Sequence, residues 1–264
     1  MAAACFRFYE ELNDFLPADR RKVSFTHVFQ GRTAVKDMIE TLGVPPTEVD
    51  LILVNGRSVD FAYIVQDGDR VSVYPVFESL DITPLVRLRP RPLRISRFIV
   101  DTHLGRLARY LRLLGFDTRY GNHYQDDVIA RLASQERRIL LTRDRGLLKR
   151  SIITHGYYVR ADQPRRQLQE VCDRLDLYRS IPPFRRCTCC NGLLAPVAKE
   201  RIVARLEPDT RRCVDEFWLC AGCGRIYWQG SHYERLWQLI RELLGSGPGR
   251  LTLASQGRRR PNPR

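Results

Sequence analysis

The sequence lacks any long apolar run. Although 44% of its 264 residues are hydrophobic, no stretch approaches the about 18 residues that suggest a membrane-spanning helix. The first residues, MAAACFRF, have neither the basic region nor the long apolar region of a secretory signal, so none is expected. The eight cysteines do not suggest a disulfide scaffold in a chain of this length. Their spacing suits metal binding in a reducing compartment, and we expect a cytoplasmic protein.

Residues 1–80 lack any cluster of nucleophilic or metal-ligating side chains. They contain 8 Lys+Arg and 12 Asp+Glu, a net charge of −4. Residues 81–264 hold the other 36 of the chain's 44 basic residues and 18 of its 30 acidic ones, a net charge of +18. A positive field of this kind suits the capture of a phosphodiester backbone. An arginine-rich surface that is only solvated is the alternative, because basic composition alone is weak support for nucleic-acid binding.

The first 80 residues read as a small α+β domain. A strand around Phe6 and Phe8 is followed by a hairpin partner over 22–29 and a helix over 33–42. Two further strands follow over 50–54 and 71–74, with turns at Asn55-Gly56 and Asp67-Gly68-Asp69. This order, with LILVNG and DGDRVSVYPVFE, resembles the β-grasp, ubiquitin-like fold of small sulfur carriers. Those carriers end in Gly-Gly, whereas this segment continues into PVFE, so binding or autoregulation is expected rather than sulfur transfer.

Two segments lack the pattern of a folded element. Residues 81–96 alternate arginine with proline, which excludes a helix and leaves a solvated tether or a backbone-binding arm. The tail over 246–264 has five arginines from Pro248 onward and no acid, and it is expected to be disordered.

Residues 97–180 alternate strands and helices, which predicts a parallel sheet with right-handed crossovers. The first helix shows apolar residues at i, i+3, i+4 and i+7 from Leu104, and Gly115 should end it. The expected strands are 98–100, 116–120, 138–142 and 157–159; the expected helices are 104–114, 128–136 and 164–175. Cys172 falls inside the last helix and is expected to be a buried, small apolar residue.

Three aspartates are expected at one edge of this sheet. Asp101 and Asp144 follow strands directly, and Asp126 lies in a loop that should emerge on the same edge. Converging carboxylates repel one another unless a cation lies among them, and Mg²⁺ or Mn²⁺ suits carboxylates together with substrate phosphates. The alternative is local: Asp101 and Asp126 could be helix N-caps, and Asp144 a turn residue.

Two cysteine knuckles mark residues 181–245. Cys187-x₂-Cys190 and Cys220-x₂-Cys223 are separated by 29 residues, a spacing that predicts a closed, structural Zn²⁺ site. Little helical pattern lies between them, so a ribbon of short strands is expected, with a closing helix after it. Cys189 and Cys213 fit the pairing less well. Tyr227 and Trp228 could pack on the ribbon or stack on bases.

These motifs together resemble a known family. VDTHLGRLARYLRLLGFDT, QDDVIARLA, RRILLTRDRGLLKR, RCTCCNG and CAGCGRIYWQGSH are similar to the Mut-seven C-terminal RNase domain family, a branch of the PIN-like nucleases with a zinc ribbon. The N-terminal segment resembles the ubiquitin-like domain that precedes it in many bacterial members. The resemblance implies a three-layer α/β/α fold and a Mg²⁺- or Mn²⁺-dependent ribonuclease with Asp101, Asp126 and Asp144 as its acids. Related proteins often have another acid at the position of Gly146, and Asp127 or Asp162 could replace it.

The sequence therefore predicts a metal-dependent, RNA-cleaving enzyme. The candidates for contacts with the RNA backbone are Arg106, Arg109, Arg143, Arg145 and Lys149. One alternative is an RNA-binding module on a nuclease scaffold without activity, and another is a β-grasp adaptor for a protein partner. The expected divisions are a β-grasp domain (1–80), a linker (81–96), a nuclease domain (97–180), a zinc ribbon with its closing helix (181–245) and a basic tail (246–264).

Overall fold

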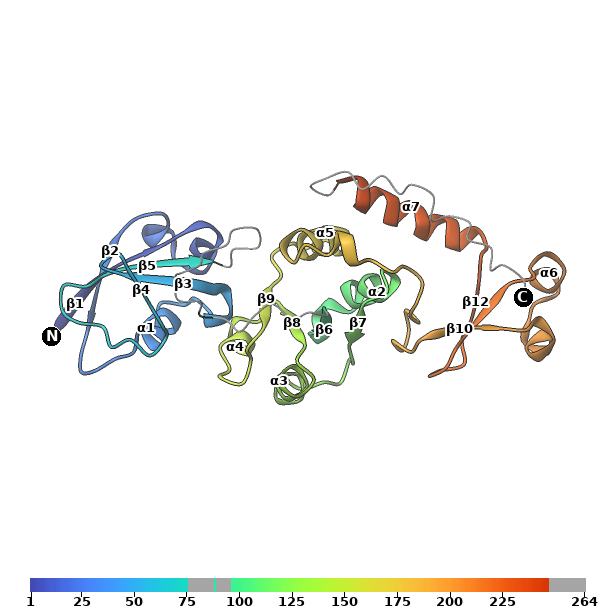
Figure 1. Ribbon diagram of the computed structural model, residues 1–264, viewed down its shortest axis with the longest axis horizontal. Helices are drawn as coiled ribbons and strands as arrows, with labels where there is room; N and C mark the ends of the chain where they lie inside the picture. Colours follow the sequence, from blue (N-terminus) through green and yellow to red (C-terminus); the bar gives the residue numbers. More distant parts are fainter. Residues whose placement is uncertain (76–87, 89–95, 247–264) are drawn as a thin grey trace. The chain divides into compact units, whose positions relative to one another are not determined.

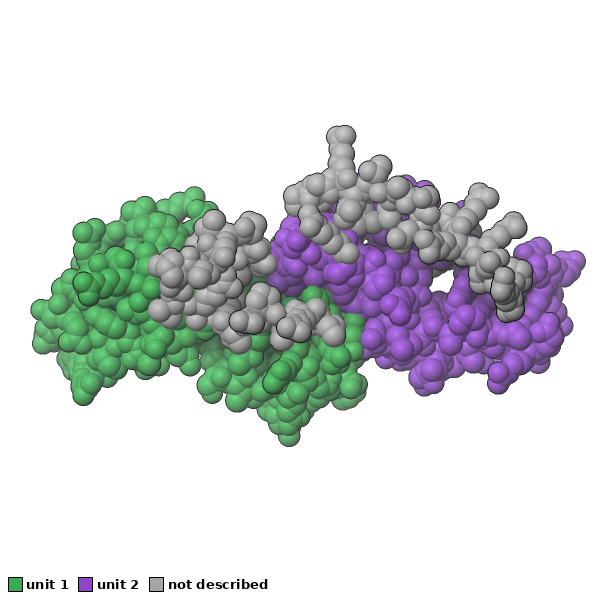
Figure 2. Space-filling model, viewed as in Figure 1, with its two compact units in different colours: residues 1–108, 117–162 green, residues 109–116, 163–264 purple. Residues whose placement is uncertain are grey.

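The computed structural model describes residues 1–75, 88 and 96–246. The chain forms two compact units: unit 1 comprises Met1–Ala108 and Asp117–Asp162, and unit 2 comprises Arg109–Phe116 and Gln163–Arg264 (Figure 2). The arginine- and proline-rich segment expected over 81–96, apart from Leu88 and Ser96, and the tail after residue 246 lie outside the described residues. Among the helices that are described, none combines the length and apolar character needed to cross a membrane.

The first part of unit 1 is a five-stranded sheet with the strand order β2-β1-β5-β3-β4 (Figure 1). Strands β1 and β5 are parallel, and the other pairs are antiparallel. The strands are β1 (Ala2–Phe8), β2 (Phe25–Phe29), β3 (Val49–Val54), β4 (Arg57–Val59) and β5 (Arg70–Pro75). The helices are α1 (Val35–Thr41) and the 3₁₀ turns η1 (Glu10–Phe15), η2 (Ala18–Arg20) and η3 (Pro46–Glu48). This is the expected β-grasp arrangement.

Alternation along β1 builds the core of this sheet. Phe6 and Phe8 are almost fully buried while Arg7 between them is exposed, as a strand with one covered face requires. Met38 and Ile39 of α1 belong to the same buried cluster. The turn between β3 and β4 needs two residues of positive φ, which Asn55 (51°) and Gly56 (81°) supply.

The second part of unit 1 is a fully parallel sheet with the strand order β7-β6-β8-β9. Its strands are β6 (Arg97–Val100), β7 (Asp117–Arg119), β8 (Ile139–Thr142) and β9 (Gly156–Tyr158). The 3₁₀ turn η4 (Thr102–Leu104) leads into α2 (Gly105–Leu113), and α3 (Asp126–Gln135) and α4 (Arg145–Leu148) complete the set. The boundary between the two units falls inside α2, after Ala108. The parallel sheet and the mixed α/β class predicted from the sequence are confirmed.

One face of this sheet is covered by α3 (Figure 1). Ile129 and Ala130 of that helix form a buried cluster with Ile99 of β6 and Leu140 of β8. Phe98 and Val100 flank Ile99 and are also fully buried, so by strand alternation they point to the opposite face. Both faces of β6 are therefore covered, which explains its continuous apolar run.

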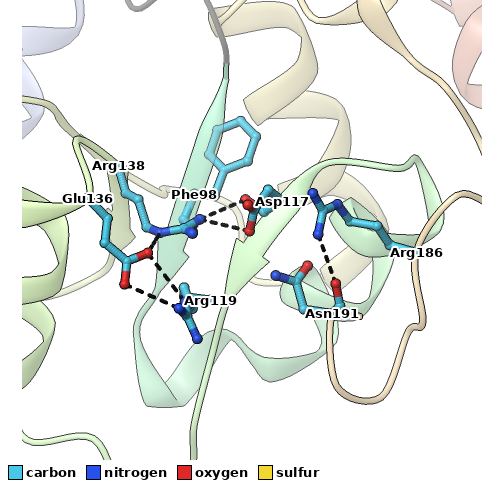
Figure 3. A network of polar contacts seen from close by, with 7 residues as sticks. All are labelled: Phe98, Asp117, Arg119, Glu136, Arg138, Arg186 and Asn191. Carbon is cyan, nitrogen blue, oxygen red and sulfur yellow. Dashed lines mark hydrogen bonds and ion pairs between the residues drawn. The ribbon is translucent and has the colours of Figure 1, made fainter. Parts of the chain in front are cut away.

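A buried arginine joins the amino-terminal ends of the strands (Figure 3). Nη1 of Arg138 donates to the main-chain oxygens of Phe98 (3.1 Å) and Asp117 (3.2 Å) and to Oδ1 of Asp117 (2.9 Å). Its Nε donates to Oε2 of Glu136 (2.6 Å), which Arg119 also contacts. Burial raises the pKa of Glu136, but the hydrogen bond and charge of Arg138, with Arg119, lower it further than burial raises it. The end of the sheet opposite Asp101 and Asp144 is thus held by an ion-pair network.

Unit 2 contains a three-stranded antiparallel ribbon with the order β10-β11-β12. Its strands are β10 (Leu194–Val197), β11 (Phe217–Cys220) and β12 (Ile226–Trp228), and its helices are α5 (Pro164–Arg174), α6 (Pro208–Cys213) and α7 (Ser231–Ser246). The 3₁₀ turns are η5 (Tyr178–Ser180), η6 (Lys199–Arg201) and η7 (Val203–Arg205). Cys172 is buried in α5, as expected, and burial raises the pKa of its thiol to about 12.

The expected ribbon of short strands is present, and the segment between β10 and β11 also contains helical turns that the sequence did not predict. Residues between β10 and β11 form η6, η7 and α6. Pro208 begins α6 at a position where its fixed φ and missing N–H are tolerated. Ile202 and Leu206 pack on Phe217 of β11 in a small buried cluster. The apolar residues that anchor this insertion are too widely spaced in sequence to produce a helical pattern.

Candidate functional site

Asp101 lies at the carboxyl end of β6 and is almost completely buried, with 4% of its surface exposed. Its main-chain N–H donates to the oxygen of Leu141, so the parallel pairing with β8 extends to this residue. Oδ1 accepts hydrogen bonds from the main-chain N–H (2.6 Å) and the hydroxyl (3.2 Å) of Thr102. Asp101 thereby caps η4, which is the local role that the sequence left open. Its second oxygen points to the neighbouring strand.

Thr142, the last residue of β8, joins two of the expected aspartates. Its hydroxyl donates to Oδ2 of Asp101 (2.6 Å) and accepts a hydrogen bond from the main-chain N–H of Asp144 (2.9 Å). The Thr142 side chain is fully buried. A polar residue that ends an otherwise apolar buried strand was the signal available in the sequence, and the site prediction did not include it.

Asp144 is the N-cap of α4. Its Oδ1 accepts hydrogen bonds from the main-chain N–H groups of Gly146 (2.6 Å) and Leu147 (3.3 Å). Gly146 fits this cap closely, because a Cβ there would lie 3.1 Å from Oδ1 of Asp144. An acidic side chain at this position would place a second negative charge beside the capping carboxylate, so the local geometry is consistent with glycine.

Asp126 is the first residue of α3, and Gln125 is its N-cap. Its side chain is about half exposed (51%) and lies 3.8 Å from a guanidinium nitrogen of Arg150. The two candidates for a fourth acid are ion-paired: Asp127 with Arg131 (2.9 Å) and Asp162 with Arg143 (2.6 Å). The hydrogen bonds described above connect Asp101 with Asp144, whereas Asp126 is held by a separate ion pair.

The five expected cations fall into two groups. Arg106 and Arg109 are exposed on α2, and Arg143 contacts the main-chain oxygen of Ala161 as well as Asp162. Arg145 and Lys149 instead donate to main-chain oxygens of the β-grasp sheet domain: Arg145 to Phe15 and Asp14 (3.2 Å each), and Lys149 to Glu40 (2.8 Å). The sequence predicted that Arg145 and Lys149 contact the RNA backbone, and it contained no sign that they contact the β-grasp domain.

The four cysteines of the two knuckles converge in unit 2. All four Sγ atoms lie within 4.8 Å of one another, with 3.6 Å between Cys187 and Cys223 and 3.3 Å between Cys190 and Cys220. Cys189 and Cys213 are exposed and lie outside this group. Within the described ranges, this quartet is the only set of three or more Cys, His, Asp or Glu side chains with ligand atoms so close together; the three aspartates do not meet that condition.

The knuckles have the tight turns and small residues that a metal centre needs. Asn191 (φ 71°) and Gly224 (φ 67°) adopt positive φ just after the first knuckle and just after the second. A Cβ on Gly192 would lie 2.9 Å from the Cys220 sulfur and 3.3 Å from the Cys190 sulfur. The loops therefore close on the four sulfurs with no room for a side chain between them.

Tyr227 of β12 completes the surroundings of the quartet. Its hydroxyl lies 3.0 Å from the Cys187 sulfur. Burial raises the pKa of Cys187, but the bonds from Tyr227 and from the main-chain N–H groups of Cys190 and Cys189 outweigh it and lower the pKa to about 6. This contact agrees with the hypothesis that Tyr227 packs on the ribbon. Trp228, the other aromatic residue of the pair, is 40% exposed.

Arg112 ties α2 to the first knuckle within unit 2. Its side chain is buried, and its Nη1 donates to the main-chain oxygens of Thr188 (3.3 Å) and Cys189 (2.6 Å). The N–H of Phe184 also donates to the oxygen of Leu113. This contact could not be predicted from the sequence, because Arg112 lies on a helix rich in arginine.

Comparisons with known proteins agree with the order of these parts. The family model described as Mut7-C RNAse domain matches residues 96–240, and the model described as Mut7-C ubiquitin matches residues 1–81. Comparisons with curated proteins and with solved structures give no match to the chain.

Proposed function

The chain belongs to the Mut7-C RNAse domain family, and we propose that it is a metal-dependent ribonuclease, a hydrolase that cleaves the phosphodiester bonds of RNA. The observation that supports this best is the hydrogen-bonded link from Asp101 through Thr142 to Asp144. It lies outside the carboxyl ends of two neighbouring parallel strands, where open α/β sheets bind their ligands.

Asp101, Asp126 and Asp144 are the residues that would hold a catalytic Mg²⁺ or Mn²⁺. Their carboxylate oxygens are the ligand type that these hard cations prefer, so the donor set fits by its chemistry. Asp126 is half exposed and Asp144 lies on an exposed turn, so both side chains can turn toward an ion. When bound, the ion would lower the pKa of a water molecule and neutralise charge on the scissile phosphate.

The chain's own residues position these acids and the substrate. Thr142 fixes the orientation of Asp101 and of the turn that carries Asp144. Arg106, Arg109 and Arg143 would bind the phosphates of the RNA on either side of the cleaved bond. Arg145 and Lys149 would join them whenever their contacts with the β-grasp domain open.

We further propose that Cys187, Cys190, Cys220 and Cys223 hold one structural Zn²⁺. Four thiolates leave no open position for a substrate, so the ion would stabilise the ribbon rather than take part in the reaction. The convergence of the four sulfurs and the glycine that closes on them support this assignment. A reducing cytoplasm would keep these thiols available.

A second candidate function is RNA binding without cleavage. The observation that favours it is the engagement of Asp144 as an N-cap, which leaves the aspartates without a compact ligand set. A third, a protein-interaction adaptor, relies on the match to the Mut7-C ubiquitin model alone. Cleavage of RNA by the purified protein is expected only if the chain is a ribonuclease, and not from either alternative.

The deciding experiment is digestion of a labelled single-stranded RNA by the purified full chain. We expect cleavage with Mn²⁺ or Mg²⁺ and none when the divalent ion is omitted. Omission is preferable to a chelator, because a chelator would also remove an ion from the cysteine quartet. Binding of the RNA with no cleavage under any of these conditions would favour the second candidate function.

Asp101→Asn should lower the rate of cleavage by at least about 100-fold, because a ligand of the metal matters at least as much as the residues that orient it. The fold should survive, since Asn keeps an acceptor for the N–H of Thr102; far-ultraviolet circular dichroism checks this. Asp209→Asn is the matched control, because Asp209 is an exposed aspartate far along the chain in α6. An Asp101→Asn protein that cleaves RNA at the parental rate would leave Asp101 with its capping role only.

A further inference from the structure

Glu48 of the β-grasp domain is buried against the edge strand of the nuclease sheet. Only 1% of its surface is exposed. Its Oε1 accepts a hydrogen bond from the main-chain N–H of Tyr158 (2.7 Å), and its Oε2 lies 3.5 Å from Nη2 of Arg160. Because β9 is the last strand of its sheet, the N–H of Tyr158 would otherwise lack a strand partner on that side. The buried carboxylate of Glu48 therefore accepts a hydrogen bond from an N–H group at the edge of the nuclease sheet, which lies in the same compact unit.

Arg160 is the second anchor of this contact. Its Nε pairs with Oδ2 of Asp14 (3.0 Å), and its guanidinium lies 5.3 Å from the ring centre of Phe15. Phe15 also packs edge-on against Tyr158, with 5.3 Å between the ring centres. The contact thus combines an arginine paired with one buried and one exposed carboxylate, a cation over aromatic rings and an aromatic pair, which is the composition of a specific interface.

The same contact engages two of the candidate RNA-binding cations, at the start and at the C-cap of α4, the helix that Asp144 caps. Arg145 immediately follows Asp144, and its guanidinium donates to the main-chain oxygens of Asp14 and Phe15. It also lies over the rings of Phe15 (5.1 Å) and Tyr158 (5.7 Å). Lys149 donates to the oxygen of Glu40 at the end of α1. Both side chains are therefore directed to main-chain oxygens of the β-grasp domain, where an RNA would offer phosphate oxygens.

We propose that the N-terminal domain is an intramolecular competitor of RNA, so that the chain is autoinhibited in the docked state. This inference is based on the proposed function, since it takes RNA as the ligand of Arg145 and Lys149. The domain carries a net charge of −4 over residues 1–80, against +18 for the remainder. An acidic domain that docks on basic residues offers them the charge that a nucleic acid would bring. RNA binds at full affinity only in the fraction of molecules whose domain has undocked.

The test uses the full chain with Asp14→Lys, and Asp19→Lys as the matched control. Asp14 pairs with Arg160, whereas Asp19 is exposed in η2 of the same domain. Both variants replace an aspartate by a lysine and therefore change the net charge of the domain equally. Docking is followed by hydrogen exchange of the Tyr158 amide, which Glu48 protects only in the docked state. RNA affinity is measured with a labelled single-stranded RNA in the absence of a divalent ion.

Asp14→Lys should speed exchange at Tyr158 and raise RNA affinity by on the order of tenfold, as the undocked fraction grows. Asp19→Lys should change neither quantity. Saturating RNA should also speed exchange at Tyr158 in the parent protein, because the two ligands exclude each other.

Faster exchange in Asp14→Lys without a gain in RNA affinity would overturn the proposal. Unchanged protection of Tyr158 in the presence of bound RNA would overturn it as well. A gain in affinity without cleavage by any form of the chain would refute the proposed ribonuclease activity and still support the competition.

Discussion

The hydroxyl of Thr142 forms hydrogen bonds with both Asp101 and Asp144 and so fixes their relative positions. Its hydroxyl is both a donor, to Asp101, and an acceptor, from the N–H of Asp144. The bond to Asp101 is out of contact with water, because Thr142 and Asp101 are buried, whereas the bond from Asp144 is partly buried. A buried polar group that loses its partner costs about 1–3 kcal/mol, so the hydroxyl matters for stability as well as for the geometry of the site.

Thr142→Val should lower the free energy of unfolding by about 2–4 kcal/mol, since the buried carboxylate of Asp101 and the partly buried N–H of Asp144 lose a partner while the volume is conserved. Cleavage of RNA should fall as well, because Asp101 loses the bond that orients it. Thr142→Ser is the matched control: it keeps the hydroxyl and loses one methyl group, which costs about 1 kcal/mol. Urea denaturation and the RNA digestion assay measure the two effects. Equal behaviour of the two variants would show that the hydroxyl has no part in the site.

Glu136 gives the sheet a dependence on pH. The network around Arg138 lowers the pKa of this carboxyl below its ordinary value of 4.5. A group whose pKa is lower in the folded state stabilises the fold above the unfolded pKa, and that contribution is lost as the pH falls through the folded pKa.

Glu136→Gln should therefore be less stable than the parent at pH 7, by about 1–3 kcal/mol for the loss of a charged acceptor of Arg138. The difference should shrink as the pH falls below about 4.5. Urea denaturation at pH 7 and at acid pH measures it, with the exposed Glu200→Gln as control. A difference that stays constant over this pH range would mean that the carboxyl is not held in its charged form by the network.

At the scale of elements, the two knuckles and the last turn of α2 form a connected structure. Cys187 and Cys190 belong to the first knuckle, and the main-chain oxygens of Thr188 and Cys189 within it accept hydrogen bonds from Arg112 of α2. Metal binding at the quartet would therefore stabilise the ribbon and also the partner of a buried arginine. Structural zinc commonly supplies a large part of the folding free energy of such small parts.

Cys220→Ser should abolish stoichiometric zinc binding and lower the melting temperature of unit 2, because a hydroxyl is a poor substitute for a thiolate ligand. Cys213→Ser is the matched control, since Cys213 is exposed in α6 and lies outside the quartet. Elemental analysis of protein purified without chelator measures the ion, and calorimetry measures the melting temperature. A parent protein that contains no zinc would contradict the assignment of the site.

In the whole molecule, the distribution of charge and the contacts of the N-terminal domain both favour its docking on basic residues of the nuclease domain. Residues 1–80 are acidic, and the rest of the chain is strongly basic. The acidic part engages Arg145, Lys149 and Arg160 within unit 1. Its removal should increase the positive field and free these cations, of which Arg145 directly follows Asp144.

The fragment 81–264 should bind single-stranded RNA as tightly as the full chain or more tightly. Its affinity should fall more steeply with salt, by about 0.7 in the logarithmic slope for each cation that gains a phosphate contact. Fluorescence anisotropy over a range of salt concentrations measures both quantities, and circular dichroism confirms that the fragment is folded. Loss of RNA binding in a folded fragment would make the acidic domain the part that binds RNA.

Most strands and helices could be predicted in order from the sequence, since their periodicity and their stop signals are local, but the short elements β4, α4 and α6 could not. Apolar alternation around Phe6 and the i, i+3, i+4 spacing from Leu104 predicted elements that the structure contains. Gly115 ends the second of these as expected, with a φ of 93° that favours glycine. The cysteine quartet was also predictable, because a knuckle is a local motif and two knuckles leave one way to combine four sulfurs.

The contacts between side chains of different elements depend on the tertiary structure. Thr142 and Asp101 are 41 positions apart, and Glu48 and Tyr158 are 110 apart. No periodicity records such contacts, because each depends on how strands pair and how one domain meets the next. The same reason explains why Arg145 and Lys149 read as free cations in the sequence: a basic side chain carries no sign of whether a phosphate or a main-chain oxygen of its own chain will bind it.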